Sequence, residues 1–287
     1  MYNFSIVSNE RSILGESPVW DDIYKRIYWV DIEGKKLHAW SYLDNKKLDW
    51  SFKNRLCSIS LTNKHNILLC AFDTYFAYFN IENDKINKLK NQVKLPHNVR
   101  FNDGKTDGFG RFWCGTMSES KPSKSNGALY MLDKQLEIHV VVKDIHISNS
   151  ITVSYHNKCL YYADTYKKLI YKADLYKNKP YIKQSSIFAD NADLEGFPDG
   201  STIDSNGFLW NAEWNGGQVV QYDREGKIIN KIKVPMKKPT CIAFGGPNLN
   251  KLFITSAKDS NDKGDVSGKT ICLETQVKGL ISNRFFI

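Results

Sequence analysis

Short aromatic and β-branched runs recur along the chain, and their spacing constrains the fold more than any other feature. Six such runs follow one another at intervals of about 40 to 50 residues: RIYWVDI from Arg26, NILLCAF from Asn66, RFWCGTM from Arg111, CLYYADT from Cys159, FLWNAEW from Phe208 and KLFITSA from Lys251. Residues of these types favour β-strands. A period of this length is typical of repeated supersecondary units that stack on their neighbours.

Each unit carries signals for about four strands. A second strand-like run follows most aromatic runs, as in GALYML and QVVQYD, and a turn such as Asp223–Gly226 then leads to a third. A further short strand precedes each aromatic run. The pattern predicts an all-β protein, a six-bladed β-propeller of four-stranded antiparallel blades, forming a single domain over residues 1–287. The runs NFSIVS and RFFI near the two ends are predicted to supply strands that close the ring.

Charge and composition argue against several other classes of protein. The net charge is +9, but the lysines are scattered in pairs instead of forming one basic run, which argues against nucleic-acid binding. No apolar run is long enough for a membrane span, and the first residues do not resemble a signal peptide. The six cysteines lack Cys-x-x-Cys spacing and sit largely in apolar runs, so we expect buried thiols in a cytoplasmic protein.

The polar residues of the inner strands share a position in the repeat. The first strand of each propeller blade lines the central channel, so equivalent positions at its entrance converge. Counting back from each aromatic run gives Glu16, Ser58, Asn102, Asn149, Asp199 and Cys241. Each polar residue taken alone could be an ordinary turn former. Their common position favours a functional site.

Carboxylates that face one another in a channel cost several kcal/mol unless a cation compensates them. The sequence therefore predicts one bound divalent metal. Ligation by carboxylate and amide oxygens favours Ca²⁺, with Mg²⁺ and Mn²⁺ as alternatives and Zn²⁺ as a weaker match. The six histidines show no ligand spacing, and no nucleophile elbow, phosphate loop or dinucleotide fingerprint is present. A covalent nucleophile is not expected.

Five segments resemble the senescence marker protein, gluconolactonase and luciferin-regenerating enzyme family, also described as regucalcin-like. They are LGESPVW from Leu14, RFNDGKTDGFGRFWCGTM from Arg100, SNSITVS from Ser148, PDGSTIDSNGFLWNAEWNGGQVVQYD from Pro198 and PTCIAFGGPNLNKLFITSA from Pro239. The resemblance covers nearly the whole chain. It implies a six-bladed propeller that binds one divalent metal and hydrolyses sugar lactones or related esters.

The resemblance also implies roles for individual residues. Glu16, Asn149 and Asp199 would hold the metal, and Asp199 would act as general base or acid. Arg100 and Asn102 would contact the substrate.

Other positions carry supporting roles or depart from the family pattern. Asp103 would orient the loop or reach the metal through water. Ser150 stands where the family usually has glycine. A family carboxylate that contacts substrate lies just after Gly-Thr-Met, where Glu119 is the nearest acid here but strict register gives Ser120.

Our leading hypothesis is metal-assisted lactone hydrolysis, in which the metal polarises the ring carbonyl and Asp199 deprotonates a water. Arg100 and Asn102 would hold the sugar hydroxyls. Hydrolysis of another ester, an organophosphate or a thioester in the same pocket is the second hypothesis. A noncatalytic propeller that binds calcium or protein partners is the third. The sequence leaves open which lactone is used, which metal is physiological and the oligomeric state.

Overall fold

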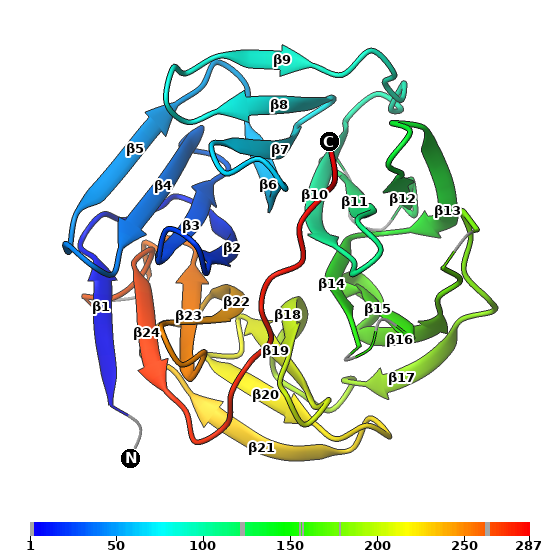
Figure 1. Ribbon diagram of the computed structural model, residues 1–287. Helices are drawn as coiled ribbons and strands as arrows, with labels where there is room; N and C mark the ends of the chain where they lie inside the picture. Colours follow the sequence, from blue (N-terminus) through cyan, green and yellow to red (C-terminus); the bar gives the residue numbers. More distant parts are fainter. Residues whose placement is uncertain (1–2, 121–123, 155, 157, 178, 262–264) are drawn as a thin grey trace.

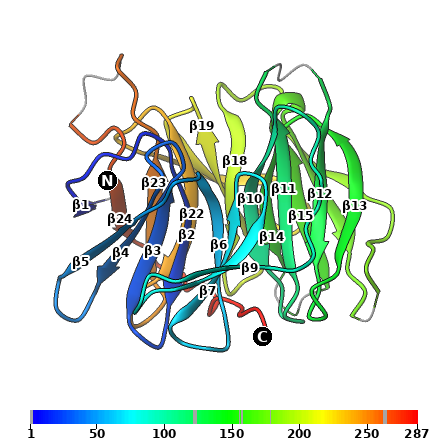
Figure 2. The same cartoon turned by 90° about the horizontal axis from the view of Figure 1, so that it is seen from above.

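Six four-stranded antiparallel sheets stand around a central channel in the computed structural model, which describes residues 3–120, 124–154, 156, 158–177, 179–261 and 265–287 (Figure 1). Seen from above, the sheets stand side by side (Figure 2). The prediction of a six-bladed β-propeller with four-stranded antiparallel blades is confirmed. No helix among the described residues is long and apolar enough to cross a membrane.

The strands follow the chain order from the inner to the outer edge of each of the first five blades. Blades one to three contain β2 (Gly15–Asp21), β3 (Arg26–Asp31), β4 (Lys36–Ser41), β5 (Lys47–Ser51), β6 (Leu56–Leu61), β7 (Ile67–Phe72), β8 (Phe76–Asn80), β9 (Ile86–Lys88), β10 (Val99–Thr106), β11 (Phe112–Ser118), β12 (Gly127–Leu132) and β13 (Ile138–Ile145). Blades four and five contain β14 (Ser148–Val153), β15 (Cys159–Asp164), β16 (Leu169–Asp174), β17 (Ser186–Asp190), β18 (Phe197–Ile203), β19 (Leu209–Trp214), β20 (Gln218–Tyr222) and β21 (Ile228–Lys233). A single 3-10 turn is described, η2 (Thr165–Lys167), directly after β15.

Blade six closes the ring with strands from both halves of the chain. It contains β22 (Pro239–Gly245), β23 (Lys251–Ser256) and β24 (Thr270–Glu274), and β1 (Phe4–Ser8) is its outer strand, paired with β24. The prediction for the N-terminal run is therefore correct. The C-terminal run RFFI does not join a blade: after β24 the chain crosses one mouth of the channel and makes an isolated bridge, Thr62 to Phe285 (Figure 1).

An aspartate and a tryptophan fix the turn between the first two strands of blades three and five. Asp107 accepts hydrogen bonds from backbone N–H groups of its turn and from Nε1 of Trp113 at 2.9 Å. Asp204 repeats the arrangement with Trp210 at 2.9 Å. Gly110 has a φ of 78°, a conformation that glycine adopts without steric cost. The spacing Asp-x-x-Gly-x-x-Trp in the sequence is the signature of this turn.

Apolar side chains pack between neighbouring blades. The largest cluster spans blades one to three and includes Tyr28, Leu69, Phe101 and Phe112, all fully buried. Five cysteines are buried and Cys159 is partly exposed, and none of the six forms a disulfide, which agrees with the expectation of buried thiols for five of them.

Candidate active site

A cavity of about 310 Å³ lies at the end of the channel where the inner strands begin. We call it the site chamber. Its lining consists of Leu14, Glu16, Arg100, Asn102, Met117, Ile147, Asn149, Thr165, Tyr166, Phe197, Asp199 and Trp214. The structure thus brings together five of the residues named from the sequence, and each of the five side chains is at most 8% exposed.

Irregular pairing at the inner strands explains why these side chains converge. Each inner strand shifts register at one point, and in blades one, three, four and five the shift falls at Glu16/Val19, Phe101/Gly104, Asn149/Thr152 and Pro198/Ser201. A bulge of this kind re-aims a side chain and interrupts pairing. The shared position recognised in the sequence therefore corresponds to a shared backbone distortion.

Ser150 lies in this distortion and has a φ of 57°. This left-handed conformation favours glycine, which accounts for the family preference at the position. The Ser150 hydroxyl compensates through hydrogen bonds, since it donates to the backbone oxygen of Asp199 at 2.7 Å and accepts from Nδ2 of Asn211 at 2.7 Å. The serine therefore ties the Asn149 bulge in blade four to the Asp199 bulge in blade five.

A directional chain of hydrogen bonds crosses the chamber wall. Arg100 Nη1 donates to Asn102 Oδ1 at 2.8 Å, and Asn102 Nδ2 donates to Asn149 Oδ1 at 2.6 Å. Asn149 Nδ2 donates to Thr165 Oγ1 at 2.9 Å, and Thr165 Oγ1 donates to the Pro198 carbonyl at 2.7 Å. An arginine can only donate and a carbonyl can only accept, so the chain fixes the orientation of both amides.

Asp103 lies behind the chamber and does not line it. Its Oδ2 accepts a hydrogen bond at 2.8 Å from the backbone N–H of Ile151, a group that the bulge in β14 removes from regular pairing. A buried backbone donor without a partner is costly, so this contact stabilises the bulge beside Asn149.

Burial disfavours the charged form of the carboxyl groups in the channel and so raises their pKa values. Loss of hydration raises the pKa of Glu16 to about 8, with a further contribution from Asp103. Burial, followed by the charges of Glu16 and Asp103, raises the pKa of Asp199 well above its usual range. Among the described residues, neither Glu16 nor Asp199 forms an ion pair within 4.0 Å, although Arg100 lowers both pKa values.

These donors fit a divalent cation. Glu16, Asn149 and Asp199 present two carboxylates and one amide oxygen to the same cavity from three blades. Oxygen ligands of this kind suit hard ions such as Ca²⁺. A bound cation would also relieve the repulsion between the buried carboxylates.

Glu119 occupies a different place from the other candidates. It does not line the site chamber but accepts two hydrogen bonds from Arg55, at 2.5 and 3.0 Å, and lies 3.7 Å from Nε of Arg100. Ser120, the alternative by strict register, is exposed. Glu119 therefore contacts the chamber through Arg100.

Sequence reasoning missed seven of the twelve residues that line the chamber, among them Thr165, Tyr166, Phe197 and Trp214. Thr165 and Tyr166 come from η2, Phe197 begins β18 and Trp214 ends β19. These four residues lie at a strand end or directly after a strand, at the same end of the propeller as the predicted ligands, and that position was a usable signal.

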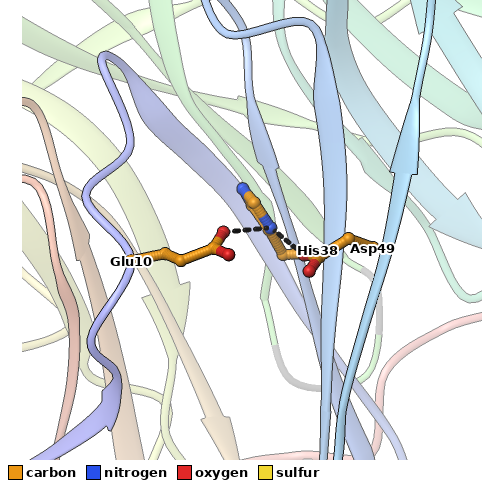
Figure 3. A group of neighbouring side chains, drawn as sticks. All are labelled: Glu10, His38 and Asp49. Atoms are coloured by element: carbon orange, nitrogen blue, oxygen red, sulfur yellow. Dashed lines mark hydrogen bonds and ion pairs between the residues drawn. The ribbon is translucent and has the colours of Figure 1, made fainter.

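A second cluster, Glu10, His38 and Asp49, lies at the outer part of blade one (Figure 3). Nδ1 of His38 contacts Asp49 Oδ1 and lies 3.6 Å from Glu10 Oε2. Groups of this kind can bind a metal, but Nζ of Lys47 lies 2.5 Å from Glu10 and 3.0 Å from Asp49. The ammonium group of Lys47 supplies the positive charge that compensates the two carboxylates. The cluster therefore joins the segment after β1 to blade one. The histidine spacing did not reveal it, because Asp49 pairs with His38 across two strands.

Comparison with known proteins agrees with this architecture. Residues 14–258 match the family described as SMP-30/Gluconolactonase/LRE-like region. The chain is 35% identical to regucalcin of Xenopus laevis over 266 residues, 90% of this chain and 87% of that protein. It is 30% identical to L-arabinolactonase of Azospirillum brasilense over 291 residues, covering 98% and 95% of the two chains.

A solved structure, described as a calcium-binding protein, regucalcin, from Agrobacterium tumefaciens, superposes with a TM-score of 0.93. The match covers 100% of this chain and 98% of that one at 26% identity. With six blades, a chamber lined by the predicted residues and a family match over most of its length, the chain belongs to the SMP-30/gluconolactonase/LRE-like family.

Proposed function

We propose that this protein hydrolyses the ester bond of a sugar lactone with the help of one divalent cation held by Glu16, Asn149 and Asp199. The observation that carries the proposal is the convergence of two buried carboxylates and an oriented amide oxygen on one cavity that also contains Arg100. Relatives named for lactone hydrolysis, such as the L-arabinolactonase, support the substrate class.

The reaction adds one water across the ring ester and yields a hydroxy acid. When bound, the cation supplies positive charge that stabilises negative charge developing on the carbonyl oxygen. Asp199 accepts a proton from the attacking water and returns one to the ring oxygen when the carbon–oxygen bond breaks. The hydrogen bonds to its backbone oxygen from Ser150 and Asn211 hold the strand that carries it.

Substrate binding falls to the other side chains of the chamber. Arg100 uses Nη1 for Phe101 and Asn102, which leaves further N–H donors for substrate hydroxyls. Phe197 and Trp214 offer apolar surface for the faces of a sugar ring and exclude water. A cavity of about 310 Å³ is of the size that a single small ring requires.

Exchange of Asp199 for asparagine tests the proposal, because the variant keeps the shape of the side chain and loses its basicity. We expect Asp199→Asn to lower kcat on glucono- and pentonolactones by about 10²- to 10⁴-fold, measured by acid release with a pH indicator. Asp199→Ala should also weaken metal binding. The control is Asp193→Asn at an exposed position of the preceding loop. Undiminished turnover by Asp199→Asn, or by protein stripped of metal, would refute the mechanism.

The same assay separates the alternatives. A carboxylic ester, an organophosphate or a thioester hydrolysed faster than any lactone would favour another substrate in the same chamber. Binding of Ca²⁺ without turnover of any of these compounds would favour a noncatalytic propeller. The description of the Agrobacterium structure as a calcium-binding protein is the observation behind that second candidate.

A further inference from the structure

The channel has a second cavity at its other end, about 540 Å³ in volume. We call it the opposite chamber. It is lined by the downstream halves of the inner strands from all six blades and by residues 279–283 of the C-terminal segment. None of its lining residues also lines the site chamber. The two cavities therefore lie in the same channel and have no lining residue in common.

Blades three, four and five contribute polar side chains and one positive charge to the opposite chamber. Lys105, Thr152 and Thr202 line it from blades three, four and five. Among the described residues, the ammonium of Lys105 makes no hydrogen bond or ion pair, and the hydroxyls of Thr152 and Thr202 make no hydrogen bond. Donors that line a cavity and lack protein partners are available to an anion.

Apolar side chains also line the opposite chamber, among them Val153 and Ile203 from blades four and five. Val19 and Phe244 line it from blades one and six, and Leu280 and Ile281 line it from the C-terminal segment. Ile281 is 59% exposed although it is a large hydrophobic residue. Ligand-binding cavities are lined mainly by apolar side chains with a few polar groups.

We propose that the opposite chamber binds an amphiphilic monocarboxylate, such as a medium-chain fatty acid. The carboxylate would lie against Lys105, Thr152 and Thr202, and the hydrocarbon chain would contact apolar side chains such as Phe244 and Leu280. A single ammonium matches a single negative charge, whereas a phosphate dianion would remain half compensated. No residue of the catalytic proposal lines this chamber, although the charge of Lys105 also lowers the pKa values of Asp103 and Glu16.

Calorimetric titration of the metal-loaded protein with octanoate tests the proposal. We expect saturable binding that weakens by about tenfold or more in Lys105→Met and by a smaller factor in Thr202→Val. Lys143→Met, at an exposed position of β13, is the matched control and should bind as the unaltered protein does. Acetate, octanol and inorganic phosphate should each bind at least about tenfold more weakly than octanoate.

A carboxylate could also bind the metal centre, so the site chamber needs its own control. Asp199→Asn should retain octanoate binding if the ligand occupies the opposite chamber. Loss of binding in Asp199→Asn with no change in Lys105→Met would overturn the proposal. It would also be overturned if octanoate does not bind, or if acetate or phosphate binds equally well.

Discussion

The orientation of the Asn149 amide is fixed by Nδ2 of Asn102 on one side and by the hydroxyl of Thr165 on the other. Thr165 accepts a hydrogen bond from Nδ2 of Asn149 and donates one to the carbonyl of Pro198, so the amide oxygen faces the chamber. Replacing Thr165 with valine keeps the shape of the side chain and removes both bonds. We expect metal affinity to fall by about tenfold, because a hydrogen bond of this kind contributes about 1 to 1.5 kcal/mol. Titration with Ca²⁺ or Mn²⁺ measures the effect.

Thr165→Ser is the matched control, since it restores the hydroxyl with a smaller side chain. Serine should bind metal within a small factor of the unaltered protein, and valine should not. Equal metal affinity in the valine variant and the unaltered protein would show that the Thr165 hydroxyl does not orient Asn149.

The sequence predicted residues whose position follows from the repeat. Glu16, Asn149 and Asp199 share a place in the period, and the same irregularity of each inner strand brings them to one mouth. Thr165 has no such period, because it lies in a 3-10 turn that β15 carries to the chamber. The pairing of Glu119 with Arg55 was equally hidden, since 64 residues separate them along the chain.

Elements that position the chamber are themselves held by buried polar groups. Glu213 in β19 is fully buried, and its Oε1 accepts a hydrogen bond at 2.9 Å from Asn191, which begins the loop leading to Phe197. Its Oε2 has no partner among the described residues. Burial raises the pKa of Glu213 to about 7. The carboxyl group therefore contributes to stability chiefly in its protonated form.

The pH dependence of unfolding follows from this pKa. The folded protein binds this proton more tightly than the unfolded chain, so the contribution of Glu213 is complete below about pH 4.5 and is lost as pH rises through about 7. Glu213→Gln remains neutral throughout. We expect its free energy of unfolding, relative to the unaltered protein, to rise by up to about 3 kcal/mol between these limits. Urea unfolding over this pH range measures the difference, and Glu225→Gln at an exposed turn is the control. A difference that does not change with pH would contradict the assignment.

Local sequence patterns predicted the strands and hairpins, because these elements depend on residues that are close together in the chain. Alternating apolar runs and the turns Asp107–Gly110 and Asp204–Gly207 specify hairpins, so the strands of each blade followed from the sequence. The C-terminal segment did not, because the fully buried Phe285 is held by long-range contacts, including backbone hydrogen bonds with Leu61 and Asn63 of blade two. A short apolar run gives no indication of whether it will extend a sheet or cross one.

The raised pKa values of the carboxyl groups in the site depend on the ring as a whole. Six blades bring Glu16, Asp103 and Asp199 into one desolvated channel, and no single blade contains two of them. With a pKa of about 8, Glu16 carries a proton at neutral pH when no cation is bound. A cation that binds its carboxylate must displace that proton.

Metal binding should therefore release protons and strengthen as pH rises. Below about pH 8 we expect the association constant to increase by up to about tenfold per pH unit for each displaced proton, and to level off above it. Calorimetry in buffers of different ionisation enthalpy counts the protons released. Glu16→Gln should bind metal more weakly and release fewer protons, whereas Glu195→Gln, an exposed acid in the loop before β18, should change neither quantity. An association constant that is the same at about pH 6 and about pH 9 would mean that Glu16 is ionised before the metal arrives, and that the channel compensates its charge by other means.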